Sequence, residues 1–178
     1  KLHFMKFLKI SYLLFFCLAL EAVIVDTGHA NVSLVKFESL EGDRSKTLLG
    51  IKMDMQENWH TYWKNPGDSG GPIKVKWSHD NNISISKIYW PTPTLIPYEP
   101  LMTYGYKNFV IFPFEITNSN NKNSYIEANI DFLICDDICV PEKALIKTNL
   151  DEIKSDPSLN DWFLKVPDQI LPVKASVD

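Results

Sequence analysis

Apolar and polar residues alternate along most of the chain between residues 32 and 150. A period of two is typical of strands that bury one face and expose the other. Turn-forming residues separate the alternating segments, so the pattern predicts about eight short strands. These are residues 32–40, 48–55, 59–64, 73–79, 83–90, 109–116, 125–134 and 144–150. Strands of this length and spacing predict an all-β fold, an immunoglobulin-like antiparallel β-sandwich.

Two segments depart from this alternation. Residues 91–100 contain four prolines, which lack a backbone N–H and do not fit an interior strand. We expect this segment to form a long, stiff surface loop. Residues 158–165 have a helical pattern and follow Asp156-Pro157, which predicts a short C-terminal helix.

The first 30 residues have the features of a bacterial-type export signal. Three lysines flank or precede an apolar segment at residues 10–20, and Gly28-His29-Ala30 has the small residues of a cleavage site. The apolar segment is short for a membrane span, and an uncleaved N-terminal anchor is the alternative. Cleavage after Ala30 would remove Cys17 and leave residues 31–178 in the periplasm, where disulfides form.

The charge of the chain argues against two kinds of partner. The formal net charge is −4, and it becomes about −5 without residues 1–30, which carry three lysines and two acidic residues. Nucleic acid and anionic membrane surfaces bind through basic patches, which this balance does not favour. Beyond residue 30 no apolar run has the length of a membrane span, so a membrane partner would have to supply one.

Cys135 and Cys139 are the only cysteines left after that cleavage. In an extended strand their Cα atoms would lie roughly 13 Å apart, whereas a disulfide needs about 7 Å or less. Pairing therefore requires a turn, which Asp136-Asp137 suits. Such a small ring stabilises the fold little, but it is well placed for attack by another thiolate. The two aspartates should raise the pKa values of the thiols, so that the pair reacts mainly with a docked partner.

Two other uses of this cysteine pair remain open. One is a structural disulfide in a non-catalytic immunoglobulin-like binding module. The other, weaker, is a copper metallochaperone, although a dinuclear copper site would need a His and a Met where Lys143 and Ile146 stand. His60 and His79 lack the spacing of zinc ligands, and His60 is better explained as a strand-end or loop-packing residue. We predict no metal site, and no cofactor, because nucleotide, flavin and haem motifs are lacking.

Four motifs lie in a characteristic order along the chain. They are residues 58–70 (NWHTYWKNPGDSG), 89–93 (YWPTP), 103–113 (TYGY leading to VIFP) and 135–141 (CDDICVP). In this order and spacing they resemble the periplasmic N-terminal domain of DsbD-type thiol:disulfide interchange proteins. The similarity is closer to the ScsB-like and stand-alone branch, which uses Cys-x3-Cys, and it covers roughly residues 32–170.

The resemblance implies a thiol-disulfide oxidoreductase of the protein-disulfide reductase type. The pair would receive electrons from a DsbD-like membrane donor or a thioredoxin-like protein and pass them to periplasmic disulfide-containing proteins. Cys139 would form the mixed disulfide with a partner, and Cys135 would resolve it. Residues 31–150 would form the interchange domain, and 151–178 a helix and tail or a linker to a further domain. Oxidation and isomerisation of partners remain alternatives to their reduction.

The family also covers its cysteines with a cap loop, and residues 96–103 fall where that loop would be. Leu101 and Met102 are the candidate apolar cap residues, and Tyr62 and Tyr104 are the candidate walls. Core packing is the alternative role for the two tyrosines. Residues 65–72 are interpreted as a turn without a further role.

Overall fold

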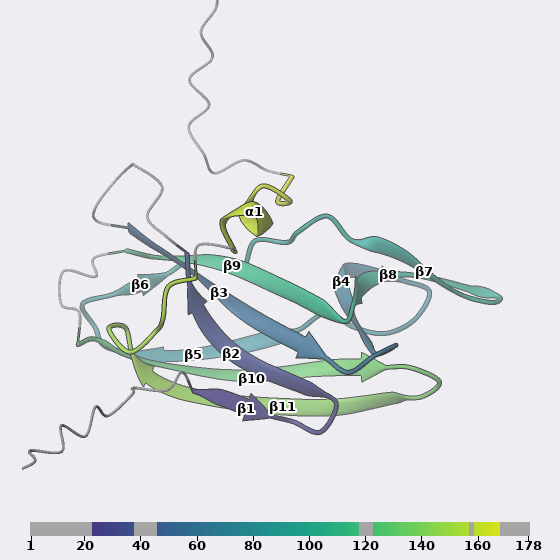
Figure 1. Cartoon of the computed structure of the whole chain (residues 1–178), viewed down its shortest axis with the longest axis horizontal. Helices are drawn as coiled ribbons and strands as arrows, with labels where there is room; N and C mark the ends of the chain where they lie inside the picture. The colour runs from purple at the N-terminus through teal and green to yellow at the C-terminus, as the bar shows by residue number, and fades with distance from the viewer. Residues whose placement is uncertain (1–22, 38–45, 118–122, 157–158, 168–178) are drawn as a thin grey trace, which may run out of the picture.

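The computed structural model describes residues 23–37, 46–117, 123–156 and 159–167, and these residues form two antiparallel sheets (Figure 1). The strands of the first sheet lie in the order β1 (Ile24–Asp26), β2 (Ala30–Lys36), β3 (Lys46–Met55), β9 (Phe109–Thr117) and β6 (Ser84–Ile85). Those of the second lie in the order β11 (Cys139–Asn149), β10 (Tyr125–Cys135), β4 (His60–Gly67), β8 (Leu101–Lys107) and β7 (Thr94–Tyr98). In this second sheet β5 (Lys74–His79) also pairs with β10. The predicted immunoglobulin-like antiparallel β-sandwich is confirmed.

The hydrophobic core lies between the sheets because apolar residues alternate along the central strands. From β9 and β10 the core takes Val110, Phe112, Phe114, Ile116, Ile126, Ala128, Ile130, Phe132 and Ile134. Burial of each large apolar side chain stabilises the fold by roughly 1.5–3 kcal/mol. The same alternation turns Leu133 and Cys135 of β10 to the outer face of the second sheet, away from this core.

The expectation of a surface loop over residues 91–100 is wrong in part. Residues Thr94–Tyr98 form β7, which pairs with β8 so that Leu95 lies opposite Tyr104 and Pro97 opposite Met102. β7 is the last strand of its sheet, and an edge strand tolerates a proline because one row of its backbone groups needs no partner. The segment is therefore not an interior strand, as the prolines predicted, but it is half of a β-hairpin.

Two predicted elements are shorter in the structure. The strand expected over residues 83–90 is reduced to β6, and the C-terminal helix to the single turn α1 (Asn160–Phe163). The described part of residues 151–167 packs along the first sheet. The Lys36 amide donates to the Lys154 carbonyl at 2.9 Å, and the Trp162 ring lies edge-on to Phe109 at 4.9 Å.

The folded domain begins before residue 31. β1 pairs with β2, and the side chain of Ala30 is buried in the core. The Thr27 hydroxyl donates to the buried carboxylate of Glu142 on β11, and the His29 ring bonds to the same carboxylate and stacks on Trp59. Cleavage after Ala30 would remove β1 and these contacts, while residues 1–22 lie outside the described part of the chain. The site of processing stays a prediction.

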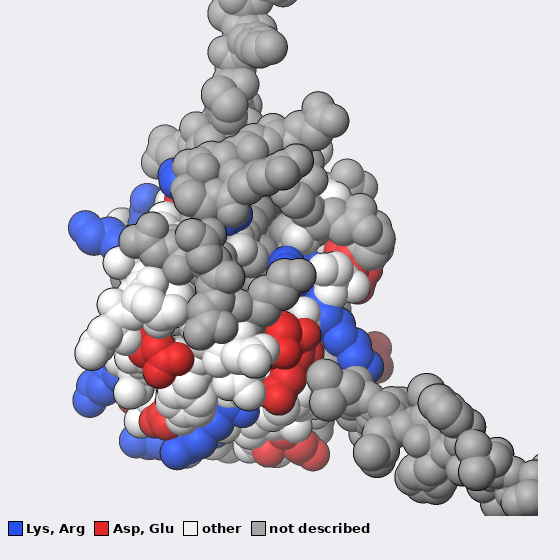
Figure 2. All heavy atoms as spheres, turned by 90° about the vertical axis from the view of Figure 1, so that its left-hand side faces the viewer, with Lys and Arg blue, Asp and Glu red and all other residues white. Residues whose placement is uncertain are grey.

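Charged residues of both signs are mixed on the end of the molecule farthest from the β10–β11 turn. Figure 2 shows this end, the left-hand side of Figure 1, with basic and acidic side chains next to one another. Within the described residues, no helix is long and apolar enough to cross a membrane.

Candidate active site

A disulfide between Cys135 and Cys139 closes the tip of the β10–β11 hairpin. Cys135 is the last residue of β10 and Cys139 the first of β11, and the two are direct partners in the strand register, with Cα atoms 4.1 Å apart. The turn between them is held by the Asp136 amide, which donates to the Ile138 carbonyl at 3.1 Å. Figure 1 shows this turn at the same end of the sandwich as β4, β8 and β7.

The two sulfurs differ in their access to solvent. Cys135 is 1% exposed, whereas Cys139 lies in the exposed part of the turn with Asp136, Asp137 and Ile138. A thiolate of another protein can therefore reach the sulfur of Cys139 more easily than that of Cys135. The acidic side chains beside the exposed sulfur are those expected from the sequence.

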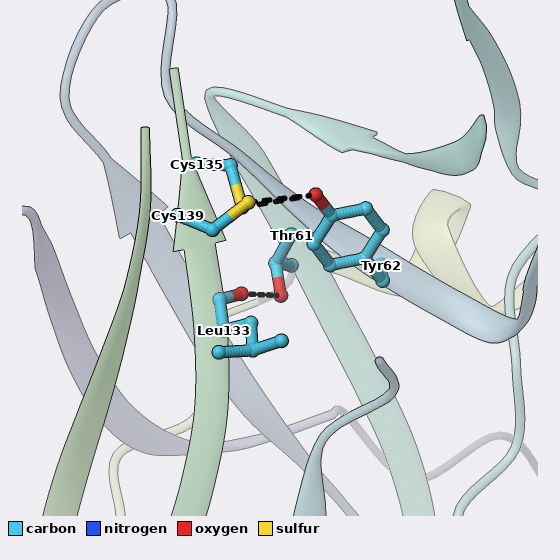
Figure 3. The surroundings of a disulfide bond; sticks show 5 residues. All are labelled: Thr61, Tyr62, Leu133, Cys135 and Cys139. Carbon is cyan, nitrogen blue, oxygen red and sulfur yellow. Dashed lines mark hydrogen bonds between the residues drawn. A yellow bond between two sulfur atoms is a disulfide. The ribbon is translucent and has the colours of Figure 1, made fainter. Parts of the chain in front are cut away.

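Tyr62 covers the buried side of the disulfide. Its hydroxyl donates to Cys135 Sγ at 2.9 Å and lies 3.3 Å from Cys139 Sγ (Figure 3). The side chain is 2% exposed, and burial raises the pKa of the phenol, so the hydroxyl keeps its proton near neutral pH. Tyr62 is therefore a permanent hydrogen-bond donor to the sulfur that solvent does not reach.

Strand β4 carries Tyr62 to this position. Cys135 of β10 pairs with His60 of β4, so His60 and Tyr62, two residues apart, lie on the same outer face as the disulfide. Thr61, between them, donates from its hydroxyl to the Leu133 carbonyl at 2.9 Å (Figure 3). This bond fastens β4 to β10 directly beside the disulfide.

The segment from Gly67 to Pro72 folds over Tyr62 and fixes its ring. Gly70 has a φ of +87°, and a Cβ atom at that position would overlap the ring of Tyr62. The Ser69 side chain hydrogen-bonds to Tyr62, and Pro72 forms a β-bridge with Tyr62. Sequence reasoning took this segment for a turn, because the requirement for glycine arises only from the way the loop folds back over the Tyr62 ring of β4.

The same segment also holds the β7–β8 hairpin. The Asp68 amide donates to the Met102 carbonyl at 3.1 Å, and the Met102 amide donates to the Asp68 carboxylate at 2.8 Å. Asp68 thus links the hairpin to the loop that covers Tyr62.

His60 is a second buried polar residue of the site. Its ring meets that of Tyr62 edge-on at 5.3 Å. Burial lowers the pKa of His60, the charge of Lys107 lowers it further, and Asp136 acts in the opposite direction. His60 is therefore neutral near pH 7, and its place beside Cys135 agrees with a packing role.

The four side chains expected around the cysteines come from two parts of the structure. Tyr62, on β4, contacts the disulfide, while Leu101, Met102 and Tyr104 lie on the β7–β8 hairpin. Met102 and Tyr104 are exposed and lie on the face of β8 opposite to Gly105, the strand partner of Tyr62. The hydrogen bonds that connect Met102 to the site come from its backbone.

The described residues offer no group of three or more His, Cys, Asp or Glu side chains that could hold a metal ion. His79 lies far along β5 and bonds to the carbonyl of its neighbour Asp80. The polar groups near the disulfide are the phenol of Tyr62, the neutral imidazole of His60, the hydroxyl of Thr61 and the acidic side chains of the turn.

Residues 31–150 match the family model described as "Thiol:disulfide interchange protein DsbD, N-terminal". The chain belongs to this family. Among solved structures it is similar to the N-terminal periplasmic domain of ScsB from Proteus mirabilis, with a TM-score of 0.60 and 21% identity. The match covers 81% of this chain and 58% of that chain, so the present chain spans less than two thirds of the ScsB domain.

Weaker likenesses extend to two yeast domains. The GAE domain of GGA2p from Saccharomyces cerevisiae has a TM-score of 0.38 and 8% identity, covering 71% of this chain and 94% of that one. The yeast GGA1 GAE domain has a TM-score of 0.37 and 9% identity, covering 71% and 97%. No curated protein sequence matches the chain. Family membership and the closed Cys135–Cys139 pair together support a thiol:disulfide interchange domain.

Proposed function

We propose that this domain relays electrons in the periplasm through the Cys135–Cys139 pair. A DsbD-like membrane protein or a thioredoxin-like protein is the donor, and periplasmic disulfide-containing proteins are the acceptors. The observation that carries the proposal is the unequal environment of the two sulfurs. Cys139 is exposed, while Cys135 is buried and accepts a hydrogen bond from Tyr62.

This asymmetry defines how the domain would be reduced. A donor thiolate attacks Cys139 Sγ, a new disulfide forms between donor and Cys139, and the Cys135–Cys139 bond breaks. The bonding electron pair leaves on Cys135 Sγ as a thiolate, which accepts the hydrogen bond of the Tyr62 hydroxyl. A second donor thiolate then attacks the donor sulfur of the mixed disulfide. Cys139 leaves as a thiolate, both cysteines take up protons, and the donor becomes the disulfide.

The second half of the cycle reverses these roles. The Cys139 thiolate attacks a substrate disulfide, and one substrate sulfur leaves as a thiolate. The Cys135 thiolate then attacks Cys139 Sγ, re-forms the disulfide of the domain and releases the second substrate thiolate. The substrate gains two electrons and the domain loses two, so Cys139 is the attacking residue and Cys135 the resolving residue.

The hairpin of β7 and β8 is proposed as the cap of this site. Leu101, Met102 and Tyr104 lie on it, and Asp68 holds its backbone next to the loop over Tyr62. Cys139 is exposed in this structure, so the proposed cap role requires the hairpin to move over Cys139, and a cognate partner would then displace it. The export signal expected in residues 1–30 is retained as a proposal, and the pairing of β1 with β2 favours cleavage before β1 instead of after Ala30.

The reduction potential of the pair tests this function. The mature domain would be equilibrated in thiol/disulfide buffers, and its redox state read by alkylation and mass spectrometry. A potential between roughly −180 and −270 mV supports the relay, because it lies in the range of exchangeable pairs. A potential below about −300 mV identifies a structural disulfide, and the domain is then a binding module.

Single-cysteine variants assign the two sulfurs. With Cys135→Ala, the Cys139 thiolate should attack the disulfide of an oxidised thioredoxin-like partner, one partner sulfur should leave as a thiolate, and the mixed disulfide should accumulate because the domain lacks its resolving thiol. Cys139→Ala is the matched control and should trap little partner, since Cys135 is buried. Equal trapping by both variants would contradict the assignment.

A further inference from the structure

A cavity on the outer face of the second sheet lies next to the disulfide. Its volume is about 190 Å³, which is about six times the share of one water molecule in the liquid, ~30 Å³. Leu133 and Pro141 line it together with Gly71 and Pro72, and the charged residues of its lining are Lys74, Lys143, Asp131 and Glu142. The space is large enough for one large apolar side chain.

The strand register connects this cavity to the exposed sulfur. Leu133 pairs with Pro141, two positions along the same hairpin from the Cys135–Cys139 pair. Figure 3 shows Leu133 on β10 beside the disulfide. Two residues of a strand span about 7 Å, so the cavity begins one pleat from the position that a partner cysteine must occupy. Lys143, four residues after Cys139, lies on the same face of β11.

Charges of both signs line the cavity, the lysines Lys74 and Lys143 and the carboxylates Asp131 and Glu142. Asp131 forms an ion pair with Lys143 at 2.9 Å. The hydrogen bond from Lys143 holds the pKa of Asp131 below its usual value, and the charges of Lys76 and Lys74 add to this effect. Three lysines thus surround one carboxylate. The nearby Glu142 carboxylate is already bound by Thr27 and His29.

We propose that this cavity binds an extended segment of the redox partner, with an apolar side chain two positions from the partner's reacting cysteine and an acidic one four positions from it. The proposal rests on the proposed relay, because the reacting cysteine is placed at Cys139. In an extended segment, residues at intervals of two project to the same side and repeat every 7 Å or so. The apolar residue therefore reaches Leu133 and Pro141, and the acidic residue reaches Lys74 and Lys143.

Binding to fluorescent peptides tests the cavity without requiring disulfide exchange. The probe has serine in place of the reacting cysteine, leucine two positions away and aspartate four positions away, and it is made in both chain directions. Its affinity for the full oxidised chain is measured by fluorescence anisotropy. Control peptides carry glycine for the leucine, or lysine for the aspartate. The domain variant Lys74→Gln/Lys143→Gln is compared with Lys147→Gln, which removes a lysine farther along the same face of β11.

We expect one chain direction to bind and each control peptide to bind about fivefold more weakly, a difference of about 1 kcal/mol. The Lys74/Lys143 variant should lose affinity by a similar factor, and Lys147→Gln should bind like the unmodified domain. Equal binding of all peptides, equal binding by both lysine variants, or no binding in either direction overturns the proposal. A domain that binds the probe but has a non-exchangeable disulfide would disprove the relay and leave the cavity assignment standing.

Discussion

The hydroxyl of Tyr62 lies 2.9 Å from Cys135 Sγ, on the side of the disulfide that solvent does not reach. The phenol is protonated near neutral pH, so this contact always presents a donor to the sulfur. A hydrogen bond to a thiolate is worth more than one to a disulfide sulfur, because the acceptor gains a full charge. The contact therefore favours the state in which Cys135 carries the departing electrons.

Tyr62→Phe should slow reduction of the disulfide while keeping the ring that packs against Gly70. Loss of a hydrogen bond worth about 1.4 kcal/mol to the leaving thiolate corresponds to roughly tenfold in rate. The measurement is the rate of reduction by dithiothreitol, followed from pH 6 to pH 9. Tyr125→Phe is the control, because Tyr125 lies at the other end of β10 and its hydroxyl donates to Glu127. A Tyr62→Phe rate within twofold of the unmodified domain would show that the hydroxyl has no part in the exchange.

Gly70→Ala should destabilise the domain and disturb the site at once. The new methyl group would overlap the Tyr62 ring, and φ of +87° disfavours any L side chain. We expect a loss of about 1–3 kcal/mol in the free energy of unfolding, measured by denaturant titration. Gly71→Ala is a matched control, since its Cβ would lie 3.7 Å from Leu133 in ordinary contact. Similar losses for the two variants would contradict the close packing of Gly70 on Tyr62.

The burial of His60 predicts that stability falls on acidification. Its pKa in the folded state is below the ordinary 6.5, so the unfolded chain binds the proton more readily. The contribution of neutral His60 is complete above about pH 7 and is lost as pH falls through 6.5 toward the lower folded-state pKa. His60→Gln should remove this part of the pH dependence, and His79→Gln, at an exposed position, should retain it. The free energy of unfolding in urea is measured at pH 7 and pH 5 for the unmodified domain and for both variants. An equal change between the two pH values in all three proteins would refute the prediction.

The contacts of residues 23–30 predict an exported protein that retains them. A variant starting at Asn31 lacks β1 and leaves the buried Glu142 carboxylate without Thr27 and His29. It should be less stable than a variant starting at Val23, by about 2–3 kcal/mol in the free energy of unfolding. Mass spectrometry of the exported protein should find a mature chain that still contains β1, whose first residue is Ile24. Equal stability of the two variants would remove the structural reason for this boundary.

The alternation of side chains was enough to predict the central strands. β3, β5, β9 and β10 agree with the expected segments within one or two residues, because each buries one face against the core. The edge strand β7 was not predicted, since a proline is read as a break wherever the number of neighbouring strands is unknown. β1 was not predicted, because it follows an apolar segment that has the features of an export signal.

The part of the site that is formed by residues close together in the sequence could be predicted. The spacing of Cys135 and Cys139 required a turn, and the structure contains it. The contacts of Asp68 with Met102 and of His60 with Cys135 join segments that are far apart in the sequence, and the contact of Gly70 with Tyr62 depends on how the loop folds back, so the motifs alone did not predict them. The apolar cavity beside Leu133 could not be predicted either, because residues of β5, β10 and β11 form it together.

Burial of a single sulfur has a regiochemical consequence. A disulfide offers two electrophilic atoms, so attack by a protein thiolate can give two regioisomers of the covalent complex. The structure leaves one of these atoms accessible, at Cys139, and keeps the other under the ring of Tyr62. In the proposed relay, the partner is therefore joined to Cys139, and the free thiol of Cys135 lies next to the bond that it must break. The burial of Cys135 thus selects one of the two possible covalent complexes.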